Sequence, residues 1–149
     1  MTATTGRDTA FEYAIASEDA SEGSLVFKEL GMMRGKSMKT KWDTVDTTAD
    51  KSPDFTKTNL VTFKSVEFSG DGVTYNDAIH NQNEFKAHVI SPSSTTAYQP
   101  KVWFRMTDIS GTYVGPFIVS EWSDERPYAD TATWSMSAMS NGAVTFTPA

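Results

Sequence analysis

Hydrophobic and polar residues alternate with a period of two in several segments, which is typical of β-strands with one buried face. The clearest case lies near the C-terminus, where Ala132, Trp134, Met136 and Ala138 alternate with Thr and Ser. Further segments that predict strands are residues 10–16, 59–70, 101–108 and 117–122. The chain is therefore expected to be mainly β.

Glycine and its neighbours mark the expected turns between these strands. Gly35 divides residues 25–34 from an alternating segment, residues 37–43, and the two are expected to pair as antiparallel strands. The expected turn and bend positions are Gly70-Asp71-Gly72, Ser110-Gly111, Gly115-Pro116 as a bend or bulge, Glu125-Arg126-Pro127, and Asn141-Gly142 as a two-residue hairpin.

Only one segment has the spacing of a helix. In residues 75–90, Ile79, Phe85 and Val89 recur at roughly helical intervals after Asn76 or Asp77, either of which could cap the first turn. One short helix is expected here. The Pro-bounded segment 91–100 is expected to be a loop of open role.

Composition is consistent with a single folded domain. The chain has 149 residues, of which 38% are hydrophobic, and this provides enough apolar surface for one core. Residues 1–10 are small and polar and are expected to form a flexible arm.

Charge and cysteine content exclude several functions. The net charge of -6 argues against tight nucleic-acid binding, which needs a basic patch, although DNA could pass such a surface without sticking. The absence of cysteine excludes disulfides, thiolate catalysis and Cys-based metal sites. Residues 1–13 contain no apolar signal segment and no stretch of the chain suits a membrane span, so neither route is expected.

The residues that could carry chemistry do not form a recognisable site. His80 and His88 would need Asp77 or Glu84 as further metal ligands, and Asp71 with Asp77 lacks the spacing of a calcium loop. A carboxylate pair from Glu121, Asp124 and Glu125 could suggest a glycosidase, but acidic clusters before a proline turn are usually solvated. We therefore expect no enzyme activity, no cofactor and no metal.

Two sets of polar residues are candidates for a surface function. Thr131, Thr133, Ser135 and Ser137 form a strand face made only of small hydroxyls, which is either solvent-facing or the lining of a channel. Lys39, Lys41 and Lys64 lie opposite apolar residues, either as edge charges that block stray pairing or as part of such a lining.

The segment VDTTADKSPDF, residues 45–55, separates two predicted strands and is too long and too polar for an ordinary hairpin turn. Because it is rich in Thr, Asp and Lys, we expect it to be disordered in the free monomer and to become ordered on assembly.

Five features follow one another along the chain: Gly6-Arg7-Asp8, the run LGMMRGKSMKTKWDTVDTTADKSPDF, Gly70-Asp71-Gly72-Val73, Gly115-Pro116-Phe117-Ile118-Val119, and the final PYADTATWSMSAMSNGAVTF. In this order they resemble the major tail tube protein of long-tailed bacteriophages. The resemblance covers nearly the whole chain, residues 1–149, as one tail-tube domain. It implies a small β-barrel or β-sandwich with one flanking helix, whose sheet is completed between subunits of a ring.

The resemblance also implies a function and partners. Hexameric rings would stack into a hollow tube in the phage tail, assembled in the host cytoplasm, that conducts DNA during ejection. Tape-measure, tail-terminator and tail-tip proteins would be further partners. Residues 45–58 would be an assembly loop, with the interface residues Val45, Asp46, Thr47, Thr48, Asp50, Lys51 and Phe55. Thr131, Thr133, Ser135 and Ser137 would face the lumen; Lys39 and Lys41 would do so only if acidic groups offset them or if they pair between subunits.

Two other functions remain open from the sequence. A carbohydrate- or protein-binding β-sandwich would expose Trp42, Trp103, Trp122 or Trp134 as a platform. A secretion-system tube ring would share the fold of a tail tube, and the sequence does not separate the two.

Overall fold

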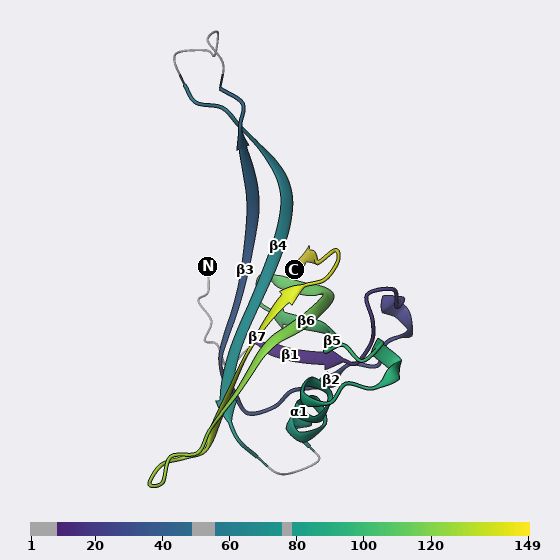
Figure 1. The fold of residues 1–149 in the computed structure, drawn as a ribbon, viewed down its shortest axis with the longest axis vertical. Coiled ribbons are helices and arrows are strands. Elements are labelled where there is room, and N and C mark those ends of the chain that lie inside the picture. Colours follow the sequence, from purple (N-terminus) through teal and green to yellow (C-terminus); the bar gives the residue numbers. More distant parts are fainter. Residues whose placement is uncertain (1–8, 49–55, 76–78) are drawn as a thin grey trace.

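The computed structural model describes residues 9–48, 56–75 and 79–149. Figure 1 shows a β-rich body from which a long two-stranded arm extends. The strands are β1 (Ala10–Ala14), β2 (Lys28–Glu29), β3 (Met33–Asp46), β4 (Asn59–Val73), β5 (Lys101–Asp108), β6 (Gly111–Glu125), β7 (Thr133–Ser140) and β8 (Thr145–Pro148). One α-helix, α1 (Gln82–Ile90), and short 3-10 turns at Glu22–Ser24 and Ser94–Thr96 complete the described elements.

All the strands belong to one antiparallel sheet. Its order is β2-β1-β5-β6-β7-β4-β3, and β8 pairs with β6. The long strand β6 belongs to both halves of this sheet: its first half pairs with β5, and its second half pairs with β7. The sheet is open in the single chain, with β2 at one edge and β3 at the other.

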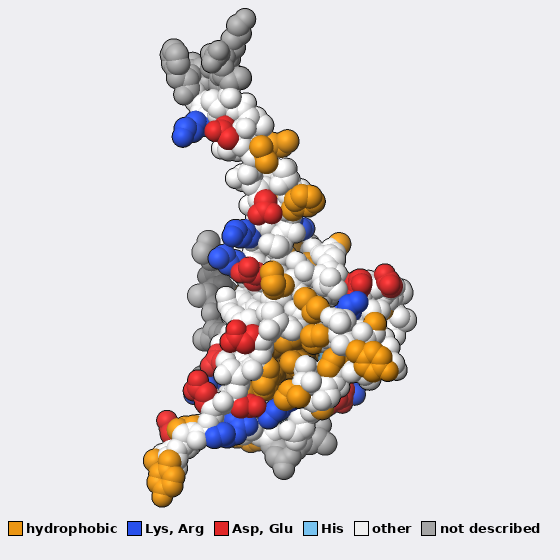
Figure 2. All heavy atoms as spheres, in the orientation of Figure 1, with side chains coloured by type: hydrophobic (Ala, Val, Ile, Leu, Met, Phe, Trp, Pro, Cys, Tyr) orange, Lys and Arg blue, Asp and Glu red, His pale blue; other side chains and the backbone are white. Residues whose placement is uncertain are grey.

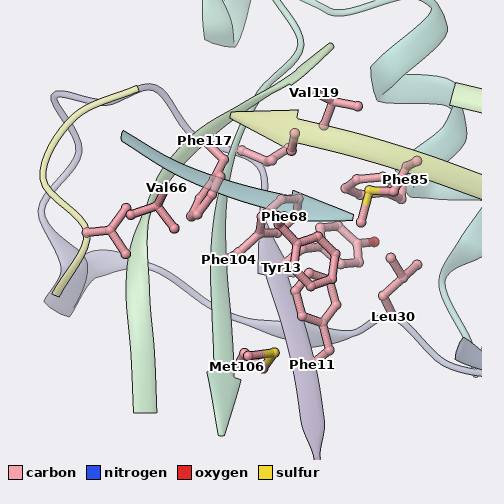
Figure 3. Packing of buried hydrophobic residues seen from close by; sticks show 14 of the residues in the cluster. Phe11, Tyr13, Leu30, Val66, Phe68, Phe85, Phe104, Met106, Phe117 and Val119 are labelled. Carbon is pink, nitrogen blue, oxygen red and sulfur yellow. The ribbon is translucent and has the colours of Figure 1, made fainter. Parts of the chain in front are cut away.

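The sheet coils so that its two halves enclose a core of aromatic residues (Figure 3). Phe11 of β1 stacks on Phe68 of β4 with ring centroids 4.4 Å apart, although three strands separate β1 and β4 in the sheet order. Phe85 of α1 is fully buried and closes one side of the core against Tyr13 and Phe104. A mainly β, sandwich-like fold with one flanking helix is confirmed.

The predicted break at Gly35 is wrong. β3 continues through Gly35 and pairs along its whole length with β4, with register shifts between Met33 and Gly35 and between Trp42 and Thr44. Residues 25–34 do not form its partner strand; they contain the two-residue β2, which pairs with β1, and the first two residues of β3 itself. Glycine in a strand can mark a bulge as well as a turn, and here it marks a bulge.

The predicted turn at Gly70-Asp71-Gly72 is also wrong, because β4 runs through it to Val73. Gly72 lies opposite Trp134 of β7, and a Cβ there would approach the Met32 carbonyl oxygen to 2.5 Å and the indole Cζ2 to 2.9 Å. The glycine is therefore required for space beneath a large side chain rather than for a turn.

The Asn141-Gly142 hairpin prediction is wrong as well. β7 and β8 do not pair with each other. Both pair with β6, and they lie end to end along the same edge of it. Pro116 lies between the part of β6 that pairs with β8 and the part that pairs with β7, and it is in register with Trp103 of β5. The bulge that was expected at Gly115-Pro116 lies instead between Val119 and Glu121. The missing N–H of proline is tolerated in this gap between two partner strands.

The helix exists but begins later than predicted. α1 starts at Gln82, with Asn81 as its N-cap residue, whereas Asn76 and Asp77 lie outside the described residues. Phe85 is buried and Val89 packs against the core, but Ile79 precedes the helix and is exposed. The segment before α1 is held instead by the buried side chain of Gln82, which donates to the carbonyls of Gly31 and Val73 and accepts from the N–H of Tyr75.

Candidate functional site

The second half of the sheet has a polar face on the side opposite the core. Here β3, β4, β7 and residues 120–125 of β6 lie side by side, and the register places their alternate residues on one surface. We call this surface the polar face and define it by Ser37, Lys39, Lys41, Ser65, Glu67, Ser69, Asp71, Glu121, Ser123, Glu125, Thr133, Ser135 and Ser137.

The predicted hydroxyl strand lies at the centre of this face. Thr133, Ser135 and Ser137 of β7 are partly exposed, while Trp134 and Met136 between them are buried in the core. Ser137 lies opposite Ser69 on one side and Glu121 on the other. The structure thus brings these three predicted residues together with hydroxyls of neighbouring strands. Thr131 is different: it precedes β7, is exposed, and donates its N–H to the Asp130 carboxylate.

Lys39 and Lys41 lie on the same face as these hydroxyls. Lys39 is directly opposite Glu67, and Lys41 is opposite Ser65. At the other end of β3, the guanidinium of Arg34 lies 3.8 Å from the Asp71 carboxylate. The face therefore carries four carboxylates against two lysines, with the guanidinium of Arg34 beside it as a third cationic group. The sequence prediction considered these lysines but missed Glu67 and Asp71, because pairing between β3 and β4 in this register could not be inferred once Gly35 was taken as a turn.

The polar face is shallowly hollowed. A depression of about 420 Å³ is lined by residues of β3, β4 and β7, among them Ser37, Ser69, Asp71, Ser135 and Ser137. A second one, of about 280 Å³, continues beside Lys39 and Glu67. Small hydroxyls and charged groups line both depressions together with Met136 in the first and Phe68, Ala138 and Met139 in the second, and neither depression has the mainly apolar walls of a small-molecule site.

Both edges of this four-stranded region are open. Within the part of the chain that the structure describes, β3 has a strand partner on one side only, and the pairing of β5 with β6 ends at Ile118. Residues 120–125 of β6 pair with β7 alone. Each edge therefore presents backbone N–H and C=O groups that a further strand could pair with.

The described residues of the predicted loop, 45–48, lie at the far end of the β3–β4 arm (Figure 1). Val45 and Asp46 belong to β3, and the ladder continues beyond it, since the Thr47 N–H donates to the Thr58 carbonyl at 2.9 Å. The Thr58 N–H donates to the hydroxyl of Thr48 at 2.9 Å. The N–H and hydroxyl donors around Thr48 lower the pKa of the Asp46 carboxyl. Asp50, Lys51 and Phe55 lie outside the described residues.

The arm exposes large hydrophobic side chains that the sequence prediction did not include. Leu60 is 59% exposed, Phe63 is 74% exposed, and Val45 lies opposite Leu60. Trp42 and Val61 are also half exposed. In the view of Figure 2, hydrophobic side chains follow one side of the arm, whereas most of its charged side chains follow the other. The signal in the sequence was the apolar run at residues 60–63, which was interpreted only as a strand.

The other candidate residues do not form a site. Among the described residues, no group of His, Cys, Asp and Glu could hold a metal ion. His88 is buried and its Nε2 lies 2.8 Å from the Lys101 carbonyl. Glu84 pairs with Lys28, and Asp124 pairs with Lys86 and Arg126. These charged groups stabilise the packing of elements against one another.

The four tryptophans do not form a platform. Trp103 and Trp134 are buried, and Trp122 packs partly buried on Trp134 with parallel rings 5.0 Å apart. Trp42 is half exposed on β3, where the Lys64 ammonium lies 5.7 Å from its ring centroid. No described helix has the length and apolar character needed to span a membrane.

Comparison with known structures finds the same fold in tubular assemblies. A chain of a gene transfer agent virion is 19% identical, with a TM-score of 0.73 over 97% of this chain and 99% of that chain. A chain in the tail of an empty gene transfer agent particle, solved with C6 symmetry, is 21% identical, with a TM-score of 0.72 and the same coverage. A chain of the SPP1 tail tube is 12% identical, with a TM-score of 0.64 over 97% of this chain and 79% of that chain. At these identities the similarities establish a shared fold.

No curated protein matches the sequence. A family model, however, matches residues 3–146, which is almost the whole chain, and that family is described as phage tail tube protein. The exposed arm, the open sheet edges and the hydrophilic face are consistent with a subunit that is built to assemble. The chain belongs to the phage tail tube protein family and is a structural protein of a virion tail.

Proposed function

We propose that copies of this chain pair edge to edge into sixfold rings, and that the rings stack into a hollow tube through which viral DNA passes. The observation that carries the proposal is the four-stranded region with two open edges and a hydrophilic face turned away from the core. A sixfold arrangement is supported by the C6 symmetry of the similar gene transfer agent tail.

The strand directions suit closure into a ring. β6, β7, β4 and β3 alternate in direction, so a copy related by rotation presents its β6 antiparallel to the β3 of its neighbour. Pairing of these edges would satisfy the open backbone groups and remove an edge that otherwise invites aggregation. The polar faces of all copies would then form one continuous inner wall.

The chemistry of the polar face fits a passage for DNA. We assign Thr133, Ser135 and Ser137 to the lumen wall, with Lys39 and Lys41 at its edge and Thr131 at its end. Small hydroxyls and an excess of carboxylates avoid the exchange of counterions that makes basic surfaces bind DNA tightly. DNA would be cargo and not a ligand, which requires no catalytic group.

The arm would serve the contact between rings. Its exposed hydrophobic residues and the loop residues Val45, Asp46, Thr47, Thr48, Asp50, Lys51 and Phe55 are our candidates for this interface. A head-to-tail contact that does not close on itself propagates as a stack. Ends of such a stack need other proteins, and we propose tape-measure, tail-terminator and tail-tip proteins as the partners there.

Cysteine accessibility tests the proposal, because the chain has no cysteine of its own. Ser137→Cys would place a thiol on the polar face, and Ser91→Cys would place one after α1 as a matched control. In concentrated protein that forms tubes by negative-stain microscopy, a bulky polyethylene-glycol maleimide should modify the Ser91 variant but not the Ser137 variant. Equal modification in the tubes, or a wild-type chain that stays monomeric, would contradict the proposal.

A further inference from the structure

Each of the two open edges of the polar face has charged side chains without an ion-pair partner. These side chains are positive at one edge and negative at the other. Lys39 and Lys41 are exposed on β3, whereas Glu121 and Glu125 are exposed on β6. Among the described residues, none of these four side chains makes an ion pair. Arg34 and Asp71, by contrast, lie 3.8 Å apart within the chain.

The distribution is asymmetric within one copy. Glu67 lies opposite Lys39 and Asp43 follows Lys41 by two residues along β3, while Glu121 and Glu125 lie opposite Ser137 and Thr133. Over residues 39–43 the edge strand β3 therefore carries two lysines against one carboxylate, whereas the edge strand β6 presents two carboxylates on this face. Two edges that are complementary in charge and in strand direction fit a second copy of the same chain.

The stagger of a closed barrel limits the register of such a pairing to two choices, one in each direction along β3. Strands in barrels tilt by about 35–45°, which displaces each strand by roughly one residue relative to the next and a four-stranded unit by roughly four. Across one copy, Ser37 is aligned with Glu121 through Ser69 and Ser137. A four-residue stagger toward the arm brings Lys41 opposite Glu121 of the next copy, and Lys39 between its Glu121 and Glu125.

We propose that Lys39 and Lys41 form an ion-pair seam with Glu121 and Glu125 of the adjacent copy, and that this seam sets the register between subunits. The inference rests on the proposed ring and adds the ion pairs that would hold adjacent subunits in register. The stagger in the opposite sense would place Met33, which has no charge, opposite Glu121. The seam also neutralises the lysines of the inner wall, so that the assembled face does not bind DNA through them.

Charge reversal tests the seam. The Lys39→Glu/Lys41→Glu variant should weaken association by on the order of tenfold at each seam and lose its rings and tubes, because attraction becomes repulsion. Glu121→Lys/Glu125→Lys should do the same, and the variant with all four changes should assemble again. Assembly is measured by sedimentation and negative-stain microscopy, with circular dichroism confirming that each variant is folded.

The comparison variant is Lys64→Glu, which reverses one charge close to Lys41 but on the opposite face, beside Trp42. It should assemble more completely than the Lys39/Lys41 variant. Normal tubes from either reversed pair, or failure of the fourfold variant to recover, would overturn the seam. If the wild-type chain forms no ring, the proposed function itself fails, and the two failures are thereby distinguished.

A second measurement does not depend on charge. Lys41→Cys/Glu121→Cys should form a ladder of covalently linked copies on mild oxidation of assembled tubes, since cross-strand neighbours lie within disulfide reach. Lys64→Cys/Glu121→Cys should not, because Lys64 lies on the other face. A ladder from the control pair alone, or from neither pair in intact tubes, would contradict the proposed register.

Discussion

One strand, β4, passes through two different environments. In the body, residues 66–73 alternate between buried and half-exposed positions, as in a sheet that covers a core. In the arm, residues 59–64 are all exposed, although they include Leu60, Val61 and Phe63. The local sequence is hydrophobic in both parts, so hydrophobic content alone does not decide which part is buried.

The difference lies in the number of neighbours. From Glu67 onward β4 lies between β3 and β7, whereas before it β4 has only β3 as a partner. A two-stranded ribbon without further packing is marginally stable. The body is thus stabilised within the monomer, and the arm is placed to gain its packing from another copy.

The largest expected effect comes from the body. Phe68→Ala removes a ring that is 1% exposed and stacked on Phe11, so it leaves a cavity in the centre of the core. We expect the free energy of unfolding of the monomer to fall by about 3–5 kcal/mol. Denaturant titration at a concentration that keeps the chain monomeric would measure it, and a loss of only a few tenths of a kcal/mol would contradict this account of the core.

The matched change in the arm is Phe63→Ala, five residues away in the same strand. Because Phe63 is 74% exposed, the free energy of unfolding of the monomer should change by less than about 0.5 kcal/mol. Tube formation should nevertheless be weakened if the arm packs on another copy. A variant that assembles as well as the wild type would exclude Phe63 from that contact.

Much of the body was accessible from the sequence because its strands alternate cleanly. The faces of β7 were predicted residue by residue, and Trp134 and Met136 are buried as the period of two requires. The turn at Ser110 and Gly111 between β5 and β6 was also predicted, although β6 begins at Gly111 and not near residue 117 as expected. In these segments local pattern and tertiary packing agree.

The errors occurred where glycine serves packing instead of turning. Gly72 leaves room beneath Trp134, and Gly35 faces Asp71 across the β3–β4 ladder. Both were interpreted as turns, so the length of the arm and the position of Lys39 opposite Glu67 were not foreseen. Such roles depend on a residue from another strand, which a single sequence does not reveal.

The second largest effect is expected at Gln82, which links the body to the start of α1. Gln82→Leu would leave the carbonyls of Gly31 and Val73 and the N–H of Tyr75 without their partner. We expect a loss of about 2–3 kcal/mol in the free energy of unfolding. Gln82→Glu keeps the acceptor for the Tyr75 N–H but loses the two N–H donors to the carbonyls. If its free energy of unfolding equals that of the wild type, the hydrogen bonds to these carbonyls contribute little to stability.

A smaller effect in the body depends on pH. Burial lowers the pKa of His88, while its hydrogen bond to the Lys101 carbonyl acts in the opposite direction. The folded state therefore binds the proton more weakly than the unfolded state, whose His pKa is about 6.5. The stability that neutral His88 contributes is fully present above the pKa of the unfolded state. It is lost as the pH falls through the lower pKa that His88 has in the folded state.

His88→Gln should remove this part of the pH dependence. Comparison of melting temperatures between neutral and mildly acidic pH should show a smaller decrease for the variant than for the wild type. The same decrease in both chains would mean that the loss arises elsewhere. Since the arm contains no histidine among its described residues, its local opening should not change in this pH range.

The smallest effect is expected in the arm and should remain local. The Thr48 hydroxyl accepts from the Thr58 N–H at 2.9 Å, beyond the last pair of the β3–β4 ladder. Thr48→Val removes this acceptor, so the Thr58 amide should exchange with solvent about three- to tenfold faster, as expected for the loss of one exposed hydrogen bond. The amides of β7 should keep their protection, because the described residues at the arm's end are exposed and lie outside the core. Faster exchange throughout the sheet would show instead that the arm and the body unfold as one unit, and the contrast between the two regions of β4 would then be one of exposure only and not of stability.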